Sequence, residues 1–166
     1  MIIWINGSFG VGKSTIAEDL KSKMANAIVY DPEKIGEFLF YIMPEKKNDF
    51  QDYELWRILN LEILKNLSKS YDTIIVPMTI TNEKYYDEII GNLRNNNIVV
   101  QDFILIATKS KIVERLDKRK NSTEWAYEQV DKCVEVFDKN FKGYKINTNN
   151  CTIEEISFKI LDILEN

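Results

Sequence analysis

The first fifteen residues contain the clearest chemical pattern in the chain. An apolar run at 2–5 is followed by Gly7-Ser8-Phe9-Gly10-Val11-Gly12-Lys13-Ser14, which fits the phosphate-loop pattern G-x-x-x-x-G-K-[ST]. Glycines let backbone N–H groups turn inward around an anion, and the following helix adds its positive end. Lys13 is expected to reach the β- and γ-phosphates of a nucleoside triphosphate, and the Ser14 hydroxyl to bind Mg²⁺. The expected nucleotide-binding residues are Gly7, Ser8, Phe9, Gly10, Val11, Gly12, Lys13, Ser14 and Thr15.

Composition excludes several other kinds of chemistry. The chain has no histidine, which removes Ser-His-Asp triads, Cys-His dyads and histidine-bound metals. A net charge of -4, with acidic and basic residues interspersed, argues against a nucleic-acid partner. Cys133 and Cys151 have no disulfide-scaffold spacing, and no stretch has the length of a membrane span or the pattern of a signal peptide. We therefore expect a cytoplasmic protein.

The elements that would position the phosphate loop are short apolar runs alternating with amphipathic segments. Strands are expected at 2–5, 27–30, 73–79 with Pro77 marking the strand end, 103–107 and 144–146; helices are expected after the loop, from Asp31, and at 53–67, 85–93, 111–120, 125–137 and from Thr152. Residues 43–52 are polar and indicate an exposed loop. This alternation predicts an α/β fold of three layers, with a parallel five-stranded sheet and helices on both faces. We expect the strand order 2-3-1-4-5 by analogy with small phosphate-loop kinases.

Two polar residues follow predicted strands at the edge where ligands bind in open parallel sheets. Asp31 follows the second strand and Thr79 ends the third. Asp31 also precedes Pro32 at a helix start, so a helix cap and a catalytic carboxylate are compatible interpretations. The sequence leaves both open.

The chain has four arginines, and three of them are candidates for binding phosphate. Arg115 and Arg119 lie one helical turn apart, which fits a phosphate clamp and a solvated charged face equally well. Arg57 stands in a predicted buried helix, where spacing alone favours an exposed residue with its stem along the surface.

Beyond these patterns, the sequence resembles the tunicamycin-resistance ATP-binding proteins, within the wider group of nucleoside-monophosphate-kinase-like phosphate-loop proteins. The resemblance covers nearly the whole chain, and its middle blocks are more specific than the phosphate loop. The blocks are 2–7, the phosphate loop, 30–34, 55–57, 75–80, 88–91, 93–94, 115–116 with Arg119, 125–126, 129–135 and 147–149.

The resemblance implies a single kinase-like domain over 1–166 that binds ATP at residues 7–15 and is associated with resistance to tunicamycin-type antibiotics. In the wider group, an acidic residue after the second strand faces the phosphoryl acceptor and arginines flanking a lid hold phosphates. These roles would fall on Asp31 and on Arg115 and Arg119, with Arg57 on the substrate side. The loop around Thr148 would meet the adenine. We expect the lid at about 115–128.

One departure from related enzymes concerns Mg²⁺. The third strand ends Val76-Pro77-Met78-Thr79 and lacks the acidic residue that many phosphate-loop enzymes place there.

The sequence and the resemblance together support two hypotheses for the function. The first is a kinase that transfers the γ-phosphoryl group of ATP to a hydroxyl of tunicamycin or a related small molecule, with Lys13, Asp31, Arg115 and Arg119 as catalytic residues and Asp31, Arg57 and Thr79 near the substrate. The second is an ATP-dependent protein that sequesters the drug unmodified. The sequence does not indicate an oligomeric state.

Overall fold

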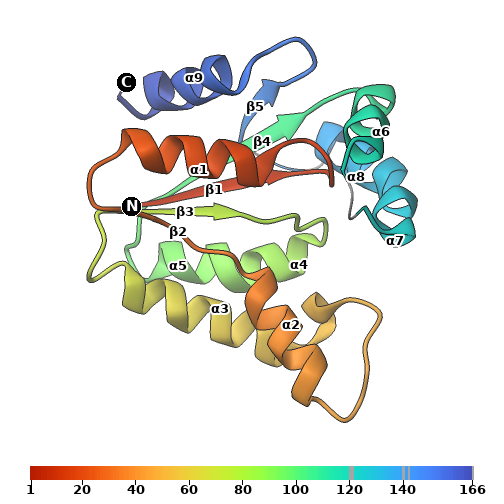
Figure 1. The fold of residues 1–166 in the computed structure, drawn as a ribbon. Helices are drawn as coiled ribbons and strands as arrows, with labels where there is room; N and C mark the ends of the chain where they lie inside the picture. Colours follow the sequence, from red (N-terminus) through yellow and green to blue (C-terminus); the bar gives the residue numbers. More distant parts are fainter. Residues whose placement is uncertain (120–121, 140, 142, 166) are drawn as a thin grey trace.

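The computed structural model describes residues 1–119, 122–139, 141 and 143–165. Its centre is a parallel five-stranded sheet in the order β2-β3-β1-β4-β5 (Figure 1). The strands are β1 Ile2–Gly7, β2 Ala27–Val29, β3 Thr73–Pro77, β4 Val100–Ile106 and β5 Tyr144–Asn147. The predicted fold class and strand order are therefore confirmed.

Helices cover both faces of the sheet, as Figure 1 shows for α1 and α9 on one side and α3 to α5 on the other. The helices are α1 Lys13–Lys23, α2 Glu33–Ile42, α3 Glu54–Leu67, α4 Glu83–Tyr86, α5 Asn92–Asn95, α6 Lys109–Asp117, α7 Glu124–Glu128, α8 Val130–Lys139 and α9 Ile153–Glu165; a 3₁₀ turn η1 spans Phe50–Asp52 and a π-helical segment η2 spans Asp87–Gly91. The predicted helix at 85–93 is thus formed by α4, η2 and α5 together. Among the described residues, no helix combines the length and the apolar character that crossing a membrane requires.

The central strand β1 is buried on both faces, and its alternating side chains build two separate cores. Ile2 and Trp4 pack in a cluster with α3 residues such as Trp56 and Leu64. Ile3 and Ile5 point to the opposite face and pack in a cluster with residues of α1 and α9. This division follows from the two-residue period of a strand. It fixes the end of β1, and hence the start of the phosphate loop, between two packed helical layers.

The expectation of an exposed loop at 43–52 is wrong for its last three residues. Residues 50–52 form η1, where the Asp49 carboxylate accepts a hydrogen bond of 2.9 Å from the Gln51 N–H. The Phe50 ring lies against Gly36, where an added Cβ would come within 2.4 Å of it, and is 5.4 Å from the Trp56 ring. Packing of the half-buried Phe50 ring therefore overrides the polar composition of this segment and brings η1 to the functional edge.

Candidate functional site

The phosphate loop joins the carboxyl end of β1 to the start of α1. Gly7 has φ +140° and lies so close to β4 that an added Cβ would approach the Leu105 carbonyl oxygen within 2.5 Å. Gly12 has φ +110° in open space, so its backbone conformation alone favours glycine there. Both glycines are thus explained by the loop's shape, and α1 begins directly afterwards at Lys13. The expected context of strand, glycine loop and helix is present.

Lys13 is buried with its ammonium group folded into the loop. Its Nζ donates hydrogen bonds of 3.0 Å to the carbonyl oxygens of Gly7 and Ser8. A lysine ammonium has three N–H donors, so one remains for a ligand. Burial lowers the pKa of Lys13 to about 8. A phosphate bound next to Lys13 would favour the protonated ammonium and raise its pKa again.

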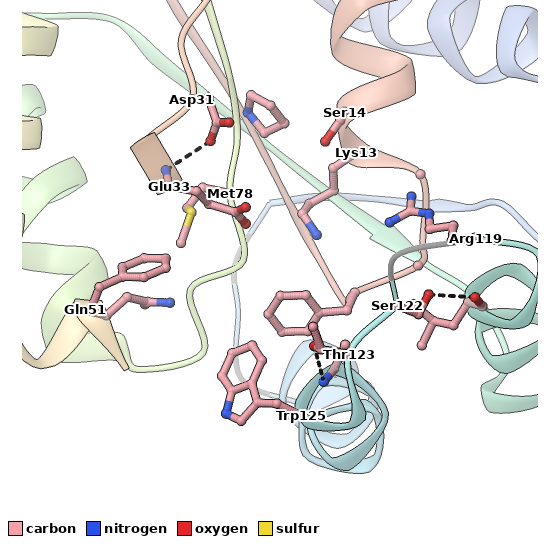
Figure 2. Close-up of a pocket in the computed structure, with 17 residues that line it drawn as sticks. Lys13, Ser14, Asp31, Glu33, Gln51, Met78, Arg119, Ser122, Thr123 and Trp125 are labelled. Atoms are coloured by element: carbon pink, nitrogen blue, oxygen red, sulfur yellow. Dashed lines mark hydrogen bonds between the residues drawn. The ribbon is translucent and has the colours of Figure 1, made fainter. Parts of the chain in front are cut away.

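A cavity of about 400 Å³ opens in front of the loop (Figure 2). Loop residues and Arg119 line one side of it, and residues from α2, η1 and the end of β3 line the other. The segment before and within α7 contributes the Trp125 ring, which meets the Phe9 ring edge-on at 5.0 Å. The lining residues are Phe9, Gly10, Gly12, Lys13, Ser14, Asp31, Glu33, Phe50, Gln51, Pro77, Met78, Leu116, Arg119, Ser122, Thr123, Trp125 and Ala126.

Asp31 caps the start of α2 and also faces the cavity, and its catalytic role stays a prediction. Its carboxylate accepts a hydrogen bond of 2.9 Å from the Glu33 N–H at the start of α2, and the same side chain lines the cavity. Glu33 lines the cavity too, and burial and the nearby Asp31 raise the pKa of Glu33. Sequence reasoning missed Glu33, although its position two residues after Asp31 at a helix start could have identified it.

The oxygen atoms at this edge can hold only part of a Mg²⁺ shell. Ser14, Asp31 and Glu33 face the cavity, while Pro77 ends β3 and Met78 follows it. Within the described ranges, no group of three or more His, Cys, Asp or Glu side chains could hold a metal ion. Mg²⁺ in phosphoryl-transfer sites is commonly bound by one or two carboxylates together with substrate phosphates and water. The residues present therefore fit Mg²⁺ that arrives with a nucleotide.

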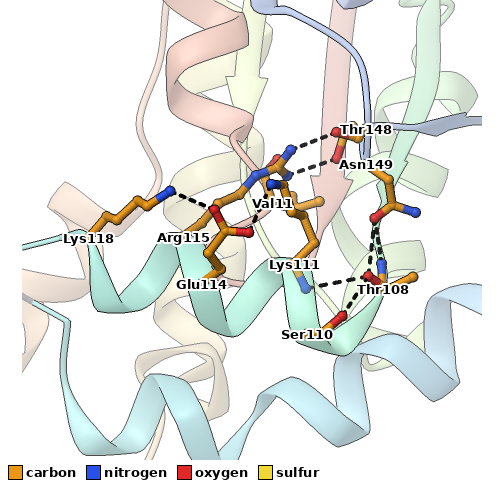
Figure 3. Close-up of polar contacts among 9 residues, drawn as sticks. All are labelled: Val11, Thr108, Ser110, Lys111, Glu114, Arg115, Lys118, Thr148 and Asn149. Atoms are coloured by element: carbon orange, nitrogen blue, oxygen red, sulfur yellow. Dashed lines mark hydrogen bonds and ion pairs between the residues drawn. The ribbon is translucent and has the colours of Figure 1, made fainter.

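Arg115 and Arg119 do not act as a pair in this structure. Helix α6 ends at Asp117, so the predicted helix to Lys120 is too long, and position 120 itself lies outside the described residues. Arg119 lines the main cavity. Arg115 instead donates hydrogen bonds to the Val11 carbonyl oxygen at 3.1 Å and to Oγ1 and the carbonyl oxygen of Thr148 at 3.0 and 2.6 Å (Figure 3).

Thr148 is fully buried, and its N–H also pairs with the Ile106 carbonyl oxygen at 2.8 Å. Its side chain therefore faces protein, and contact with an adenine would fall to neighbouring residues of the same loop. A second cavity of about 280 Å³ is lined by residues of the phosphate loop and by one residue of the Thr148 loop, Cys151. Its lining is Gly10, Val11, Gly12, Thr15, Ile16, Arg115, Lys118, Arg119, Cys151, Ile153 and Ile156.

The two remaining substrate candidates lie outside the lining of the main cavity. Arg57 is buried, so the expectation of an exposed side chain is wrong. It forms an ion pair with Glu88, donates a hydrogen bond of 2.6 Å to the Gln51 carbonyl oxygen and lies over the Tyr85 ring. The Thr79 hydroxyl donates to the Gly7 carbonyl oxygen at 2.8 Å. Arg57 thus holds the backbone of η1, and Thr79 holds the backbone of the phosphate loop.

The solved structure of the Deinococcus radiodurans tunicamycin resistance protein is similar to this chain with a TM-score of 0.83 and 27% sequence identity, covering 98% of this chain and 94% of that one. The resemblance to the tunicamycin-resistance, kinase-like phosphate-loop family is confirmed. A putative adenylate kinase of Methanocaldococcus jannaschii is 24% identical over 170 residues, covering 99% of this chain and 86% of that protein. A Mycobacterium tuberculosis APS kinase in complex with AMPPNP and APS shares the fold, with a TM-score of 0.71, 15% identity and coverage of 99% and 97%. No family model matches.

Within this family resemblance, the two arginines should differ in what they contribute to folding. Replacing Arg115 with alanine removes three hydrogen bonds that join α6 to the phosphate loop and to the β5–α9 loop. We expect the free energy of unfolding to fall by about 1–3 kcal/mol. Arg119→Ala, at an exposed residue of the cavity, should change it by less than about 0.5 kcal/mol. Urea unfolding measures both variants, and equal losses would contradict the distinction.

The lowered pKa of Lys13 predicts a pH dependence of ATP affinity. Above pH about 8 the unliganded ammonium loses its proton, so the Kd for ATP should rise by up to about tenfold per pH unit. Folding should respond in the opposite direction, because between pH about 8 and 10.5 the unfolded chain binds more protons at Lys13 than the folded chain and deprotonation favours the folded form. Titrations with ATP across this range check the first effect. A Kd that stays constant would contradict it.

Proposed function

We propose that this protein is an ATP-dependent phosphotransferase that moves the γ-phosphoryl group to a hydroxyl of a small molecule. One observation carries the proposal. The phosphate loop, whose Lys13 has one N–H donor left for a ligand, lines the same cavity of about 400 Å³ as the carboxylates of Asp31 and Glu33. Phosphoryl transfer depends mainly on positioning and on electrostatic stabilisation of the transferring group. The cavity brings together residues suited to both tasks.

The chain's own residues divide the work between the two sides of the cavity. The N–H groups of the loop and the Lys13 ammonium hold the nucleotide's phosphates, and Arg119 stabilises charge on the transferring group. Asp31 orients the acceptor hydroxyl and takes its proton as the bond between its oxygen and the γ-phosphorus forms and the bond from that phosphorus to the β–γ bridging oxygen breaks. Arg115 positions the loop through its hydrogen bond to the Val11 carbonyl oxygen.

Ser14 would hold Mg²⁺ together with the nucleotide's phosphates and water, and the ion would supply charge neutralisation at those phosphates when bound. The second cavity, which has Ile153 and Ile156 in its lining, would hold the adenine. In this assignment Cys151, which lies in the same loop as Thr148, would face the adenine.

We propose that residues 115–128 act as a lid, of which 120 and 121 lie outside the described residues. Ser122, Thr123, Trp125 and Ala126 line the cavity, and Trp125 meets the phosphate loop through Phe9. Closure of this segment would exclude water, which otherwise would compete for the phosphoryl group.

Tunicamycin, or a related nucleoside-like compound, is the acceptor that we propose from the family resemblance, with antibiotic resistance as the outcome. Both cysteines are free thiols, which supports a cytoplasmic location, and the acidic net charge supports a small-molecule rather than a nucleic-acid partner.

A second candidate function is sequestration of the drug without transfer. The observation that favours it is Met78, in the lining where many phosphate-loop enzymes have an acidic residue.

Mass spectrometry separates the two functions. The protein is incubated with ATP, Mg²⁺ and tunicamycin, and the drug is then recovered. A kinase would add about 80 Da to the drug, the mass of the HPO₃ unit that phosphoryl transfer delivers. Drug that is retained by the protein with its mass unchanged would support sequestration and contradict the proposed transfer to tunicamycin.

A further inference from the structure

The two sides of the main cavity differ in charge. Lys13 and Arg119, the cations in its described lining, lie on the side of the phosphate loop and the segment after α6. Figure 2 shows Asp31, Glu33, Gln51 and Met78 together on the opposite side. We call this second side, formed by Asp31, Glu33, Phe50, Gln51 and Met78, the acceptor wall. Its charged members are both carboxylates.

The arginine that a phosphate-bearing acceptor would need is committed elsewhere. Arg57 reaches toward this region from α3, but its charge is paired with the Glu88 carboxylate. A second donor of the same guanidinium holds the Gln51 carbonyl oxygen at 2.6 Å. Arg57 thus positions the backbone of η1, and what η1 presents in the acceptor wall is the Phe50 ring and the uncharged Gln51 amide.

Nearby lysines do not supply the missing charge in the cavity. Lys34 on α2 pairs with Glu37 at 3.0 Å, and Lys47 pairs with Glu45 at 2.5 Å. Neither lysine lines the cavity. Among the residues that define it, the acceptor wall thus has two carboxylates and no cation, and a further anion placed there would be repelled.

We infer that the phosphoryl acceptor is an uncharged or cationic hydroxyl compound, and that compounds presenting a phosphate, sulfate or carboxylate to the acceptor wall are rejected. This inference rests on the proposed function. It separates this chain from an adenylate kinase, whose acceptor is a nucleoside monophosphate, although a putative adenylate kinase is among its relatives. It also names a property by which acceptors can be screened before their identity is known.

The test uses matched compounds that differ in charge at one group. Uridine and uridine monophosphate, adenosine and adenosine monophosphate, and glucose and glucuronate are compared, together with tunicamycin. Binding is measured calorimetrically with a non-hydrolysable ATP analogue present, and transfer is measured with ATP. We expect at least about tenfold preference for the uncharged member of each pair that binds. Equal or tighter binding of the anionic members, or binding of no compound, would overturn the inference.

A variant tests the cause of the preference. Glu33→Gln removes one charge from the acceptor wall at nearly constant shape, so the preference for uncharged compounds should shrink at least about threefold. Glu37→Gln is the matched control, because it makes the same change one helical turn further along α2 at an exposed position outside the cavity. An unchanged preference in Glu33→Gln would contradict the electrostatic cause.

The two readouts keep this inference distinct from the proposed function. Transfer to adenosine monophosphate in preference to adenosine would overturn the inference while supporting phosphotransfer. Selective binding of uncharged compounds without any transfer would do the reverse, because it supports the charge selectivity and contradicts the kinase.

Discussion

Replacing Lys13 with alanine is expected to weaken ATP binding by at least about 100-fold while the fold is retained. The ammonium is held by the Gly7 and Ser8 carbonyl oxygens and has one donor left for phosphate. Losing a charge-assisted hydrogen bond and the ion's attraction to a phosphate removes about 3 kcal/mol of binding free energy. Calorimetric titration with ATP measures the change directly.

The Lys13→Ala variant needs a control for general effects of losing a lysine. Lys21→Ala removes an exposed lysine two turns later on the same helix, and should leave ATP affinity unchanged. Circular dichroism establishes whether Lys13→Ala remains folded. A folded Lys13→Ala protein that binds ATP as tightly as the parent would remove the phosphate loop from the proposed function.

The sheet could be predicted from the sequence because its strands are buried on both faces. Such strands appear as continuous apolar runs, and the alternation with helical periods leaves few arrangements open. The structure confirms all five strands, with β4 beginning three residues before its predicted start. The predicted helix start at Thr152 was equally local, because Thr152 and Glu155 cap each other. The Thr152 hydroxyl accepts from the Glu155 N–H at 3.2 Å, and the Glu155 carboxylate accepts from the Thr152 N–H at 2.8 Å.

The parts of the site that could not be predicted depend on contacts between distant segments. Arg115 lies 104 positions from Val11 and 33 from Thr148, so its spacing from Arg119 gave no indication of its partners. Arg57 pairs with Glu88 in a different helix. Helical spacing shows which residues share a face, but it does not show whether an arginine's charge is already paired. For the same reason, helical spacing did not show that the acceptor wall and the opposite side of the cavity differ in charge.

Asp31→Asn is expected to lower the rate of phosphoryl transfer by about 10²–10⁴-fold and to leave ATP affinity unchanged. Asparagine keeps a side-chain oxygen that can accept the Glu33 N–H, so the start of α2 should keep its cap. It cannot take the acceptor's proton, which is the contribution that general base catalysis requires. Single-turnover kinetics with an acceptor identified by mass spectrometry, together with ATP titration, separate the chemical step from binding.

Asp49 provides a matched control for the capping role. Its carboxylate accepts the Gln51 N–H at 2.9 Å, the same distance and the same two-residue separation as Asp31 and Glu33, and it lies outside the lining of the cavity. Asp49→Asn should therefore preserve both stability and transfer. If Asp31→Asn behaved like Asp49→Asn in the transfer assay, Asp31 would be a helix cap only, and the proton would have to leave through another group. Glu33 would then be the next residue to test, because its raised pKa favours proton uptake at the same edge of the sheet.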